Sequence, residues 1–360
     1  MIRLGKIYSS LNQFERIDKL VKTKFLILIL LMFVATIFSI FLGAVNVRIL
    51  TILKIVLTQI PFLGGYFHFS IKPSSYEIIT VLREPTIIAA LFIGATLGVG
   101  GAVIQSIFRN PITEPYIIGI SSGATLGVVL VLAFGITLFG LYTESIFAFI
   151  FAMAIVSVVF IISMRSGKIS GLFLLLVGIA LSYFVSAIVA FFLFSNIKLQ
   201  NEAFFWLLGS IGLMTTPELI ITLPIMFIAM VLTFMYYKEL NALQMGDEYA
   251  RSVGVNVNFS KGAFLLLTAL SVSAAVSISG LIGFVGLIIP HISRLLFGGS
   301  NKFVIPSSAI IGASFLLICN DIARNVAKPE ILPIGIVTGI VGVPIFVILM
   351  MKISKGAYEA

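Results

Sequence analysis

Long runs of apolar residues, separated by short polar stretches, dominate the pattern of this chain. Ten of them are long enough to cross a hydrocarbon layer of about 30 Å as helices, although the run containing Pro290 is short. Their approximate bounds are 25–45, 86–108, 115–136, 145–164, 171–195, 219–237, 261–279, 281–297, 303–322 and 331–351. The pattern predicts an all-α integral membrane protein with about ten transmembrane helices.

Residues 1–24 show a different pattern, with apolar side chains at helical spacing among basic ones. This predicts an amphipathic helix at the cytoplasmic membrane surface, and a disordered basic leader is the alternative. The run that follows is too long for the apolar part of a signal peptide, and no small-residue cleavage pattern follows it. We therefore expect one membrane domain over 25–352 and a short tail over 353–360.

Composition supports lipid as the solvent. The 360 residues are 60% hydrophobic and 10% charged, whereas soluble domains carry about 25% charged residues. The net charge of +9 would suggest nucleic acid in a soluble protein. Here the basic residues lie between apolar runs, so they indicate topology and contacts with membrane lipids instead of nucleic acid.

The distribution of Lys and Arg predicts the orientation. With the N-terminus inside, 16 of the 23 basic residues fall on inner segments and 7 on outer ones. This bias places both termini in the cytoplasm of a multi-pass cell-membrane protein. Spans two to five and seven to ten then form two sets of opposite direction, which suggests an inverted-topology repeat.

Small residues recur at the four-residue spacing that lets helix backbones approach closely in lipid. With 31 glycines, chance is the alternative for any single instance. Together they predict a tightly packed bundle. The instances are Gly94 with Gly98, Gly119 with Gly123 and Gly127, and Gly335 with Gly339.

The sequence offers no clear motif for nucleotide binding, metal binding or ion coupling. The nearest approach to a phosphate-binding loop, Gly167-Lys168, lacks the upstream glycine and the following Ser or Thr. Cys319 cannot form an internal disulfide, and His68 and His291 have no neighbouring ligands, so no metal site is expected. Carboxylates lie near span ends rather than mid-bilayer, where an ion-coupled carrier would hold them. An ion-coupled secondary transporter and an integral membrane enzyme or assembly factor remain alternatives, but we expect a partner to supply the energy.

The loop over 238–260 is the longest later one on the inner side. Asp247 and Glu248 fall in the first turn of a short helix, and Gly254 fits the position just past its end. A helix of about two turns is too short to be stable alone, so docking to a partner explains it. An ordinary capped surface turn is the alternative.

Four stretches, in order, carry a family resemblance. They are Leu82-Arg83-Glu84-Pro85 leading into 94–105, Arg109-Asn110-Pro111 with 112–124, Gly280 to Arg294, and Asp321 to Gly335. Together with the loop around Gly246 they resemble the FecCD permease family. These are membrane subunits of type II ABC importers for ferric siderophores, haem and cobalamin. The resemblance covers about 80–352.

The resemblance implies a permease domain that works as a dimer, here a homodimer, with two ABC ATPase subunits and an extracytoplasmic substrate-binding protein. ATP and Mg would bind on the ATPase, so this chain is expected to be no enzyme and to bind no cofactor itself. The family's pathway is lined partly by span five and the short helix after it, about 171–212 here. The coupling loop corresponds to Leu243, Met245, Gly246, Asp247, Glu248, Ala250, Arg251, Val253 and Gly254.

In the family, basic residues at the outer span ends contact acidic residues of the binding protein, and Arg83 and Arg324 match those positions. Many members have a second Arg where this chain has Thr86, so docking would either be weaker or use other residues such as Lys328. A membrane-interface anchor is the alternative for Arg83.

The remaining motif residues have pathway or structural roles in the resemblance. Pro111 should break the helix at Asn110, and Pro290 should kink its span. His291 is interpreted as a hydrogen-bonded packing residue rather than a gate, and Gln105 as interhelical glue or pathway lining. Glu330 would cap the last helix or pair with Arg324. The full set is Gln105, Asn110, Pro111, Pro115, Gly119, Pro290, His291, Arg294, Asp321, Glu330, Pro333 and Gly335.

Overall fold

The computed structural model describes residues 2–43, 45–59, 69–164, 169–212 and 214–358, without the side chains of 2–18 and 352–358. His68, Gly167 and Lys168 lie outside this part. Its helices are α1 (Ile2–Phe41), α2 (Ile49–Gln59), α3 (Pro73–Glu77), the π-helical η2 (Ile78–Arg83), α4 (Glu84–Phe108), the 3-10 turn η3 (Pro115–Ile118), α5 (Ile120–Phe134), the 3-10 turn η4 (Gly140–Tyr142), α6 (Thr143–Met164), α7 (Gly171–Ser195), α8 (Ile197–Leu207), α9 (Thr216–Met235), α10 (Tyr237–Met245), α11 (Asp247–Ser252), α12 (Val257–Ser279), α13 (Val285–Phe297), α14 (Asn301–Val326) and α15 (Ile334–Tyr358).

Each of the ten predicted runs lies on a helix, which confirms the all-α membrane fold. Eight helices of the described part are long and apolar enough to cross a membrane. The runs 115–136 and 281–297 form only the shorter helices α5 and α13, because non-helical residues take up the start of each run. The short helix α2, with Ile52 and Ile55 buried, was not predicted.

Two sets of four helices repeat one packing scheme. Helix α4 of the first set packs on α13 and α14 of the second set. Its counterpart α12 of the second set packs on α5 and α6 of the first. Within both sets the second helix contacts the third and fourth. The second helices, α5 and α13, begin at left-handed residues, Gly119 (φ 93°) and Phe284 (φ 69°). The inverted repeat of spans two to five and seven to ten is thereby confirmed.

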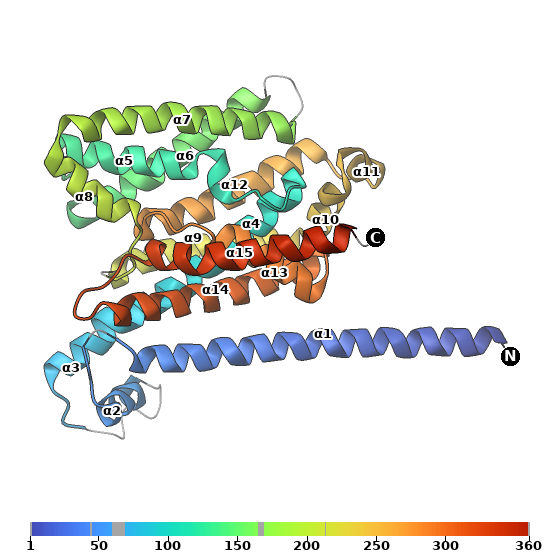
Figure 1. Ribbon diagram of the computed structural model, residues 1–360, viewed down its shortest axis with the longest axis horizontal. Coiled ribbons are helices and arrows are strands. Elements are labelled where there is room, and N and C mark those ends of the chain that lie inside the picture. The colour runs from blue at the N-terminus through green and yellow to red at the C-terminus, as the bar shows by residue number, and fades with distance from the viewer. Residues whose placement is uncertain (1, 44, 60–68, 165–168, 213, 359–360) are drawn as a thin grey trace.

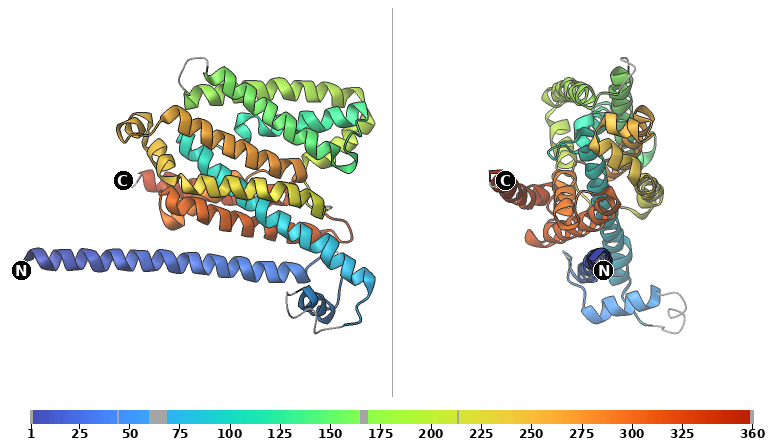
Figure 2. Two further views of the ribbon diagram at one scale, coloured as in Figure 1. Left: turned by 180° about the vertical axis from the view of Figure 1, so that it is seen from behind. Right: turned by 90° about the vertical axis from the view of Figure 1, so that its right-hand side faces the viewer.

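The N-terminal helix α1 runs along one side of the bundle and extends beyond it (Figures 1 and 2). It is one continuous helix, so the boundary expected near residue 24 is absent from the backbone, and the amphipathic pattern of residues 1–18 stays a prediction. The ring of Phe25 lies 4.5 Å from that of Phe297. Ser39 donates a 2.6 Å hydrogen bond to Asp321. These contacts attach α1 to α13 and α14.

The molecule has two distinct ends. Both termini lie at the end that carries α11, and α2, α3 and α8 lie at the other (Figure 1). We refer to these as the α11 end and the opposite end. This arrangement agrees with an even number of crossings.

Helices α4 and α14 make backbone contact through small residues. A Cβ on Gly94 would collide with the carbonyl of Gly312, and one on Gly98 would lie 2.5 Å from that of Ser308. Gly101 similarly faces the backbone of Gly286 on α13. The spacing thus predicted close packing correctly here, but Gly339 has open space around its Cα, so that pairing is wrong.

Candidate functional site

The α10–α11 segment is a short helical corner anchored to the bundle by apolar side chains. Leu240 and Leu243 of α10 and Ala250 of α11 are completely buried. Gly246 joins the helices at φ 124°, a conformation that side chains rarely adopt. Gly254 ends α11 at φ 85°, as predicted. The corner is therefore held rigidly against the bundle.

Asp247 is not a free docking charge. Its carboxylate forms a 2.7 Å ion pair with Lys261, whose side chain is only 3% exposed. The same ammonium donates to the carbonyl of Ile169 at 3.1 Å. The pair ties α11 to α12 and to the start of α7, so the partly exposed Asp247 already has a partner within this chain, and its role in docking stays a prediction.

The outer face of the corner is exposed and mixed in character. Met245 is 71%, Tyr249 50% and Val253 52% exposed, while Glu248 and Arg251 are also at the surface. No hydrogen bond or ion pair joins the Glu248 or Arg251 side chain to another residue of the described part. We call these five residues the α11 ridge; apolar side chains among charges are typical of a protein-binding surface.

A buried polar network leads from α10 into the bundle. Asn241 accepts from the backbone N–H of Asn301 at 2.7 Å, and Gln244 accepts from the Asn301 side chain at 2.9 Å. The Asn301 amide oxygen accepts from Ser106 on α4 at 3.2 Å. Arg294 of α13 donates to Ser106 at 3.4 Å. The network joins α10, α14, α4 and α13.

The network ends at Gln105, which is 3% exposed. Its amide oxygen accepts from Arg294, and its amide nitrogen donates to the carbonyl of Leu287 at 3.0 Å. Gln105 thus joins α4 to α13, as the interpretation as interhelical glue predicts. It also borders a cavity of about 400 Å³ at the α11 end, together with Arg109, Asn110, Pro111, Gln244, His291, Arg294 and Leu295.

His291 is 8% exposed, and its Nε2 atom has no hydrogen-bond partner in the described part. The prediction of a hydrogen-bonded packing residue is therefore contradicted at Nε2, although the side chain is buried. The helix continues past Pro290 to Phe297.

Arg83 and Arg324, at the opposite end, are internal. They are 2% and 5% exposed, so the expectation of exposed docking residues is wrong. Arg83 donates to the carbonyls of Ile40 at 2.8 Å and Val45. It also lies against Gly43. Its guanidinium therefore ties the end of α1 to the start of α4.

Thr86, which departs from the family pattern, fits this arrangement. Its hydroxyl accepts from Arg324 at 3.2 Å and donates to the Arg83 carbonyl at 2.9 Å. A second large cation would have to enter this buried space, because Thr86 is 2% exposed.

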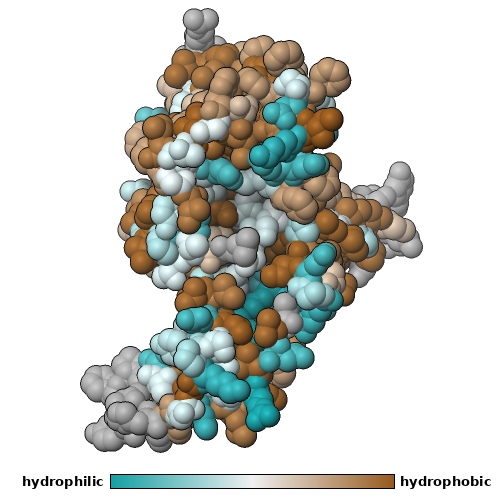
Figure 3. All heavy atoms as spheres, turned by 90° about the vertical axis from the view of Figure 1, so that its left-hand side faces the viewer, coloured by the Kyte–Doolittle hydropathy of each residue, from teal (hydrophilic) through white to brown (hydrophobic). Residues whose placement is uncertain are grey.

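Figure 3 views the opposite end, where hydrophobic side chains cover the flanks and hydrophilic ones gather in separate patches.

The other motif residues shape turns. Arg109 ends α4 at φ 51°, and Asn110 accepts from the Ile112 N–H at 3.0 Å, which confirms the break at Pro111. Pro115 opens η3. Pro333 precedes α15, where Gly335 donates to the Leu208 carbonyl at 3.1 Å.

Glu330 is exposed, and Arg324 donates to Thr86 instead of to it. Asp321 holds Ser39 of α1. The Glu330 carboxylate itself has no hydrogen bond or ion pair within the described part.

A polar cleft lies between α7, η3 and α13. It has a volume of about 480 Å³, and its lining includes Glu114, Tyr116, Ser182, Tyr183 and Ser186. Burial raises the pKa of the Glu114 carboxyl, which lies between the spans. The Tyr116 hydroxyl donates to the Ile282 carbonyl at 3.0 Å. This cleft is the best candidate for a pathway wall.

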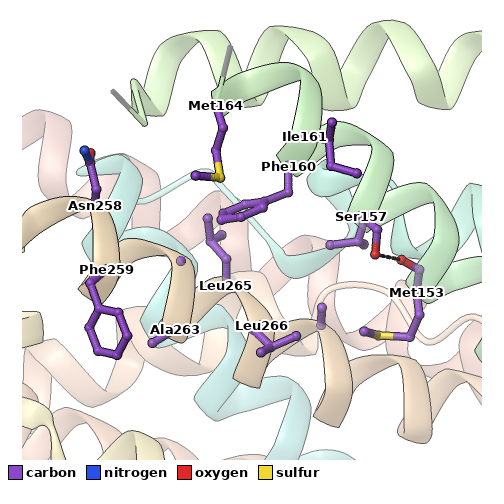
Figure 4. Close-up of a pocket in the computed structure, with 13 residues that line it drawn as sticks. Met153, Ser157, Phe160, Ile161, Met164, Asn258, Phe259, Ala263, Leu265 and Leu266 are labelled. Carbon is purple, nitrogen blue, oxygen red and sulfur yellow. Dashed lines mark hydrogen bonds between the residues drawn. The ribbon is translucent and has the colours of Figure 1, made fainter. Parts of the chain in front are cut away.

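A larger groove of about 700 Å³ lies between α6 and α12 (Figure 4). Its lining is almost wholly apolar, with Met153, Phe160 and Ile161 from α6 facing Leu265 and Leu266 from α12. Such a wall cannot replace the hydrogen bonds of a hydrated polar cargo. We therefore assign the groove to the lipid-facing side rather than to a pathway.

Comparisons with known proteins agree with this geometry. The model of the FecCD transport family matches residues 30–352. The hemin transport system permease protein HmuU of Yersinia pestis is 34% identical over 290 residues, 79% of this chain and 86% of that protein. The molybdate import system permease protein MolB of Haemophilus influenzae is 35% identical, covering 79% and 84%.

A solved structure shares the fold. An inward-facing ABC transporter assigned to the metal-chelate type superimposes with a TM-score of 0.77 at 30% identity, covering 90% of this chain and 97% of that one.

Proposed function

Because this chain belongs to the FecCD transport family, we propose that it is the permease subunit of an ATP-driven importer that forms the pathway for a metal chelate. A ferric siderophore is our first assignment, with cobalamin and haem as the other candidates. The observation that carries this proposal is the rigid α10–α11 corner, which presents an exposed ridge and connects through a buried network to α4 and α13.

The ridge is the surface where the ATPase subunits dock in this proposal. Its apolar centre of Met245, Tyr249 and Val253 would be covered by the partner, and Glu248 and Arg251 would fix the register. ATP and Mg would bind to the two ATPase subunits. The α11 end, with both termini, would then face the cytoplasm of an inner-membrane protein.

A second copy of this chain completes the pathway. The outward side of α7 exposes large apolar side chains, including Phe184 at 65% and Phe191 at 70%, and α15 exposes Ile340 at 70%. A pathway wall on one subunit needs an opposing wall, and the polar cleft beside α7 supplies one in each copy. An extracytoplasmic binding protein would deliver the cargo to the opposite end.

The cleft favours a chelate over molybdate, the cargo named for one relative. Its polar lining consists of hydroxyl groups and the Glu114 carboxylate, with no Lys or Arg. A hydroxyl-lined surface can release a bulky, weakly held chelate, whereas a small oxyanion would gain no cationic contact there.

Uptake into sealed vesicles tests the proposal. Vesicles holding this chain, its ATPase and its binding protein should accumulate a ferric hydroxamate chelate only when ATP is inside with the ATPase. Molybdate at the same concentration should not accumulate. Uptake that continues without ATP and follows an imposed proton or sodium gradient would instead establish the secondary-transporter alternative.

A further inference from the structure

Two guanidinium groups at the α11 end have no anionic partner. Arg294 donates to three neutral acceptors, on Gln105, Ala102 and Ser106. Arg109 makes no hydrogen bond or ion pair within the described part. Both line the cavity of about 400 Å³ beside Gln244. Arg109 is exposed and Arg294 is partly buried, and neither forms an ion pair in the described part, so the cavity carries an unbalanced positive charge.

His291 lines this cavity as well. Its side chain is 8% exposed, lines the same cavity, and leaves Nε2 without a partner in the described part. A buried polar atom without a partner is unusual in a folded protein. Nε2 can donate a hydrogen bond when it carries the proton. Two guanidinium groups and the imidazole ring therefore border one space, although Nε2 itself is closed off from solvent.

We propose that this cavity binds the carboxylate of an acidic side chain from the ATPase subunit, which enters as that subunit docks on the α11 ridge. The inference rests on the proposed function and names a contact within it. Arg109 and Arg294 would hold the carboxylate oxygens, because guanidinium groups match carboxylates in geometry and charge.

The position of the cavity favours the partner as the source of the anion. Gln244 belongs to α10, and a Cβ on Gly246 would lie 3.3 Å from the Arg109 guanidinium. Arg109 thus lies beside the turn that leads into the ridge. A subunit that covers the ridge reaches the cavity, and its carboxylate would contact the start of the network to α14 and α4.

Cysteine labelling of the purified, lipid-reconstituted permease tests the charge of the cavity. Leu295, which lines it and is 59% exposed, is replaced in Leu295→Cys on a Cys319→Ala background. We expect a sulfonate-bearing methanethiosulfonate reagent to react about tenfold faster than its trimethylammonium analogue, relative to the same ratio at Ser252→Cys. Adding Arg109→Gln should remove most of this preference. The matched removal of an exposed charge, Lys302→Gln, should not.

Adding the ATPase subunits tests the source. Both cysteines should become protected, and Arg109→Gln should weaken ATPase association about tenfold, more than Lys302→Gln does. Equal reagent ratios at the two positions would overturn the proposal. So would protection of Ser252→Cys alone, or equal association of the two charge variants. Protection of Leu295→Cys by inorganic phosphate alone would assign the cavity to a free anion instead. Failure of the ATPase to associate with the unmodified chain would refute the proposed function itself.

Discussion

The arginine side chains at the two ends of the bundle differ in whether this chain supplies their partners. At the opposite end, Arg83 and Arg324 are buried, and acceptors of this chain itself, including two carbonyls and the Thr86 hydroxyl, receive their hydrogen bonds. At the α11 end, Arg109 and Arg294 line an open cavity and have no carboxylate partner in the described part. One end is complete within the chain, and the other has the features of a surface that a partner completes.

This difference separates stability from interaction. Removing a cation that the chain itself satisfies should destabilise the fold, because carbonyls are left without donors. Removing a cation that awaits a partner should leave the fold intact and weaken assembly. An arginine can therefore either stabilise the fold or bind a partner. Its burial and the acceptors of its hydrogen bonds distinguish the two roles.

The strongest test of the comparison is Arg83→Met. It would remove the hydrogen-bond donor from the carbonyls of Ile40 and Val45 and with it the tie between α1 and α4, so we expect a loss of about 3 kcal/mol in the free energy of unfolding. Thermal unfolding in detergent measures it. Arg48→Met, at the same end but exposed, is the matched control. Equal unfolding temperatures for the two variants would contradict an internal role for Arg83.

The next effect concerns the one ion pair that ties α11 to α12. Asp247→Asn leaves the Lys261 ammonium, 3% exposed, without its carboxylate. We expect a loss of about 2 kcal/mol, reduced from a fully buried pair because Asp247 is partly exposed. Glu248→Gln, one residue along on the exposed ridge, should leave stability unchanged and lower only ATPase association. Co-purification and thermal unfolding of both variants separate the two roles, and identical behaviour would refute the distinction.

Close helix packing near the network is tested by Gly101→Ala. The new Cβ would meet the Gly286 backbone of α13, which cannot give way as a side chain can. We expect a destabilisation of about 1–2 kcal/mol. Gly339→Ala, which has open space, should be neutral. An unchanged unfolding temperature for Gly101→Ala would show that α4 and α13 are less closely packed than described.

The smallest structural effect is expected at Asn301→Ala, for which we predict about 1 kcal/mol. Its functional effect should be larger, because it removes the side chain that joins Gln244 of α10 to Ser106. Uptake per ATP hydrolysed should fall while ATPase co-purification persists. Asn325→Ala, whose amide contacts only its own helix through Asp321, should keep normal coupling. A normal ratio for Asn301→Ala would remove the network from the mechanism.

Much of the fold could be predicted from sequence, because ten apolar runs and their Lys and Arg flanks follow directly from the chemistry of lipid. The helical nature of 238–260 was also predictable, since Gly246 and Gly254 are positioned to bound a short helix. The roles of Arg83, Arg324 and Asp247 were not. Whether a charge at a helix end is exposed or paired depends on residues distant in sequence, such as Ile40 for Arg83 and Lys261 for Asp247.

The polar network was missed for a related reason. Asn241, Gln244 and Asn301 have no motif of their own, and Gln244 and Asn301 lie near helix ends, where a polar residue needs no explanation. The signal that could have found them is that Asn301 opens a span directly after the turn around Ser300. Only the packing of α10 against α14 gives that position a partner.

The contact of α4 with α14 limits which parts of the bundle can move. At Gly94 with Gly312 and at Gly98 with Ser308, main chain touches main chain, with no layer of flexible side chains between them. Sliding or rotating one helix past the other would force backbone atoms together. The two helices must therefore travel as a single rigid body, and any rearrangement of the bundle has to occur at contacts other than this one.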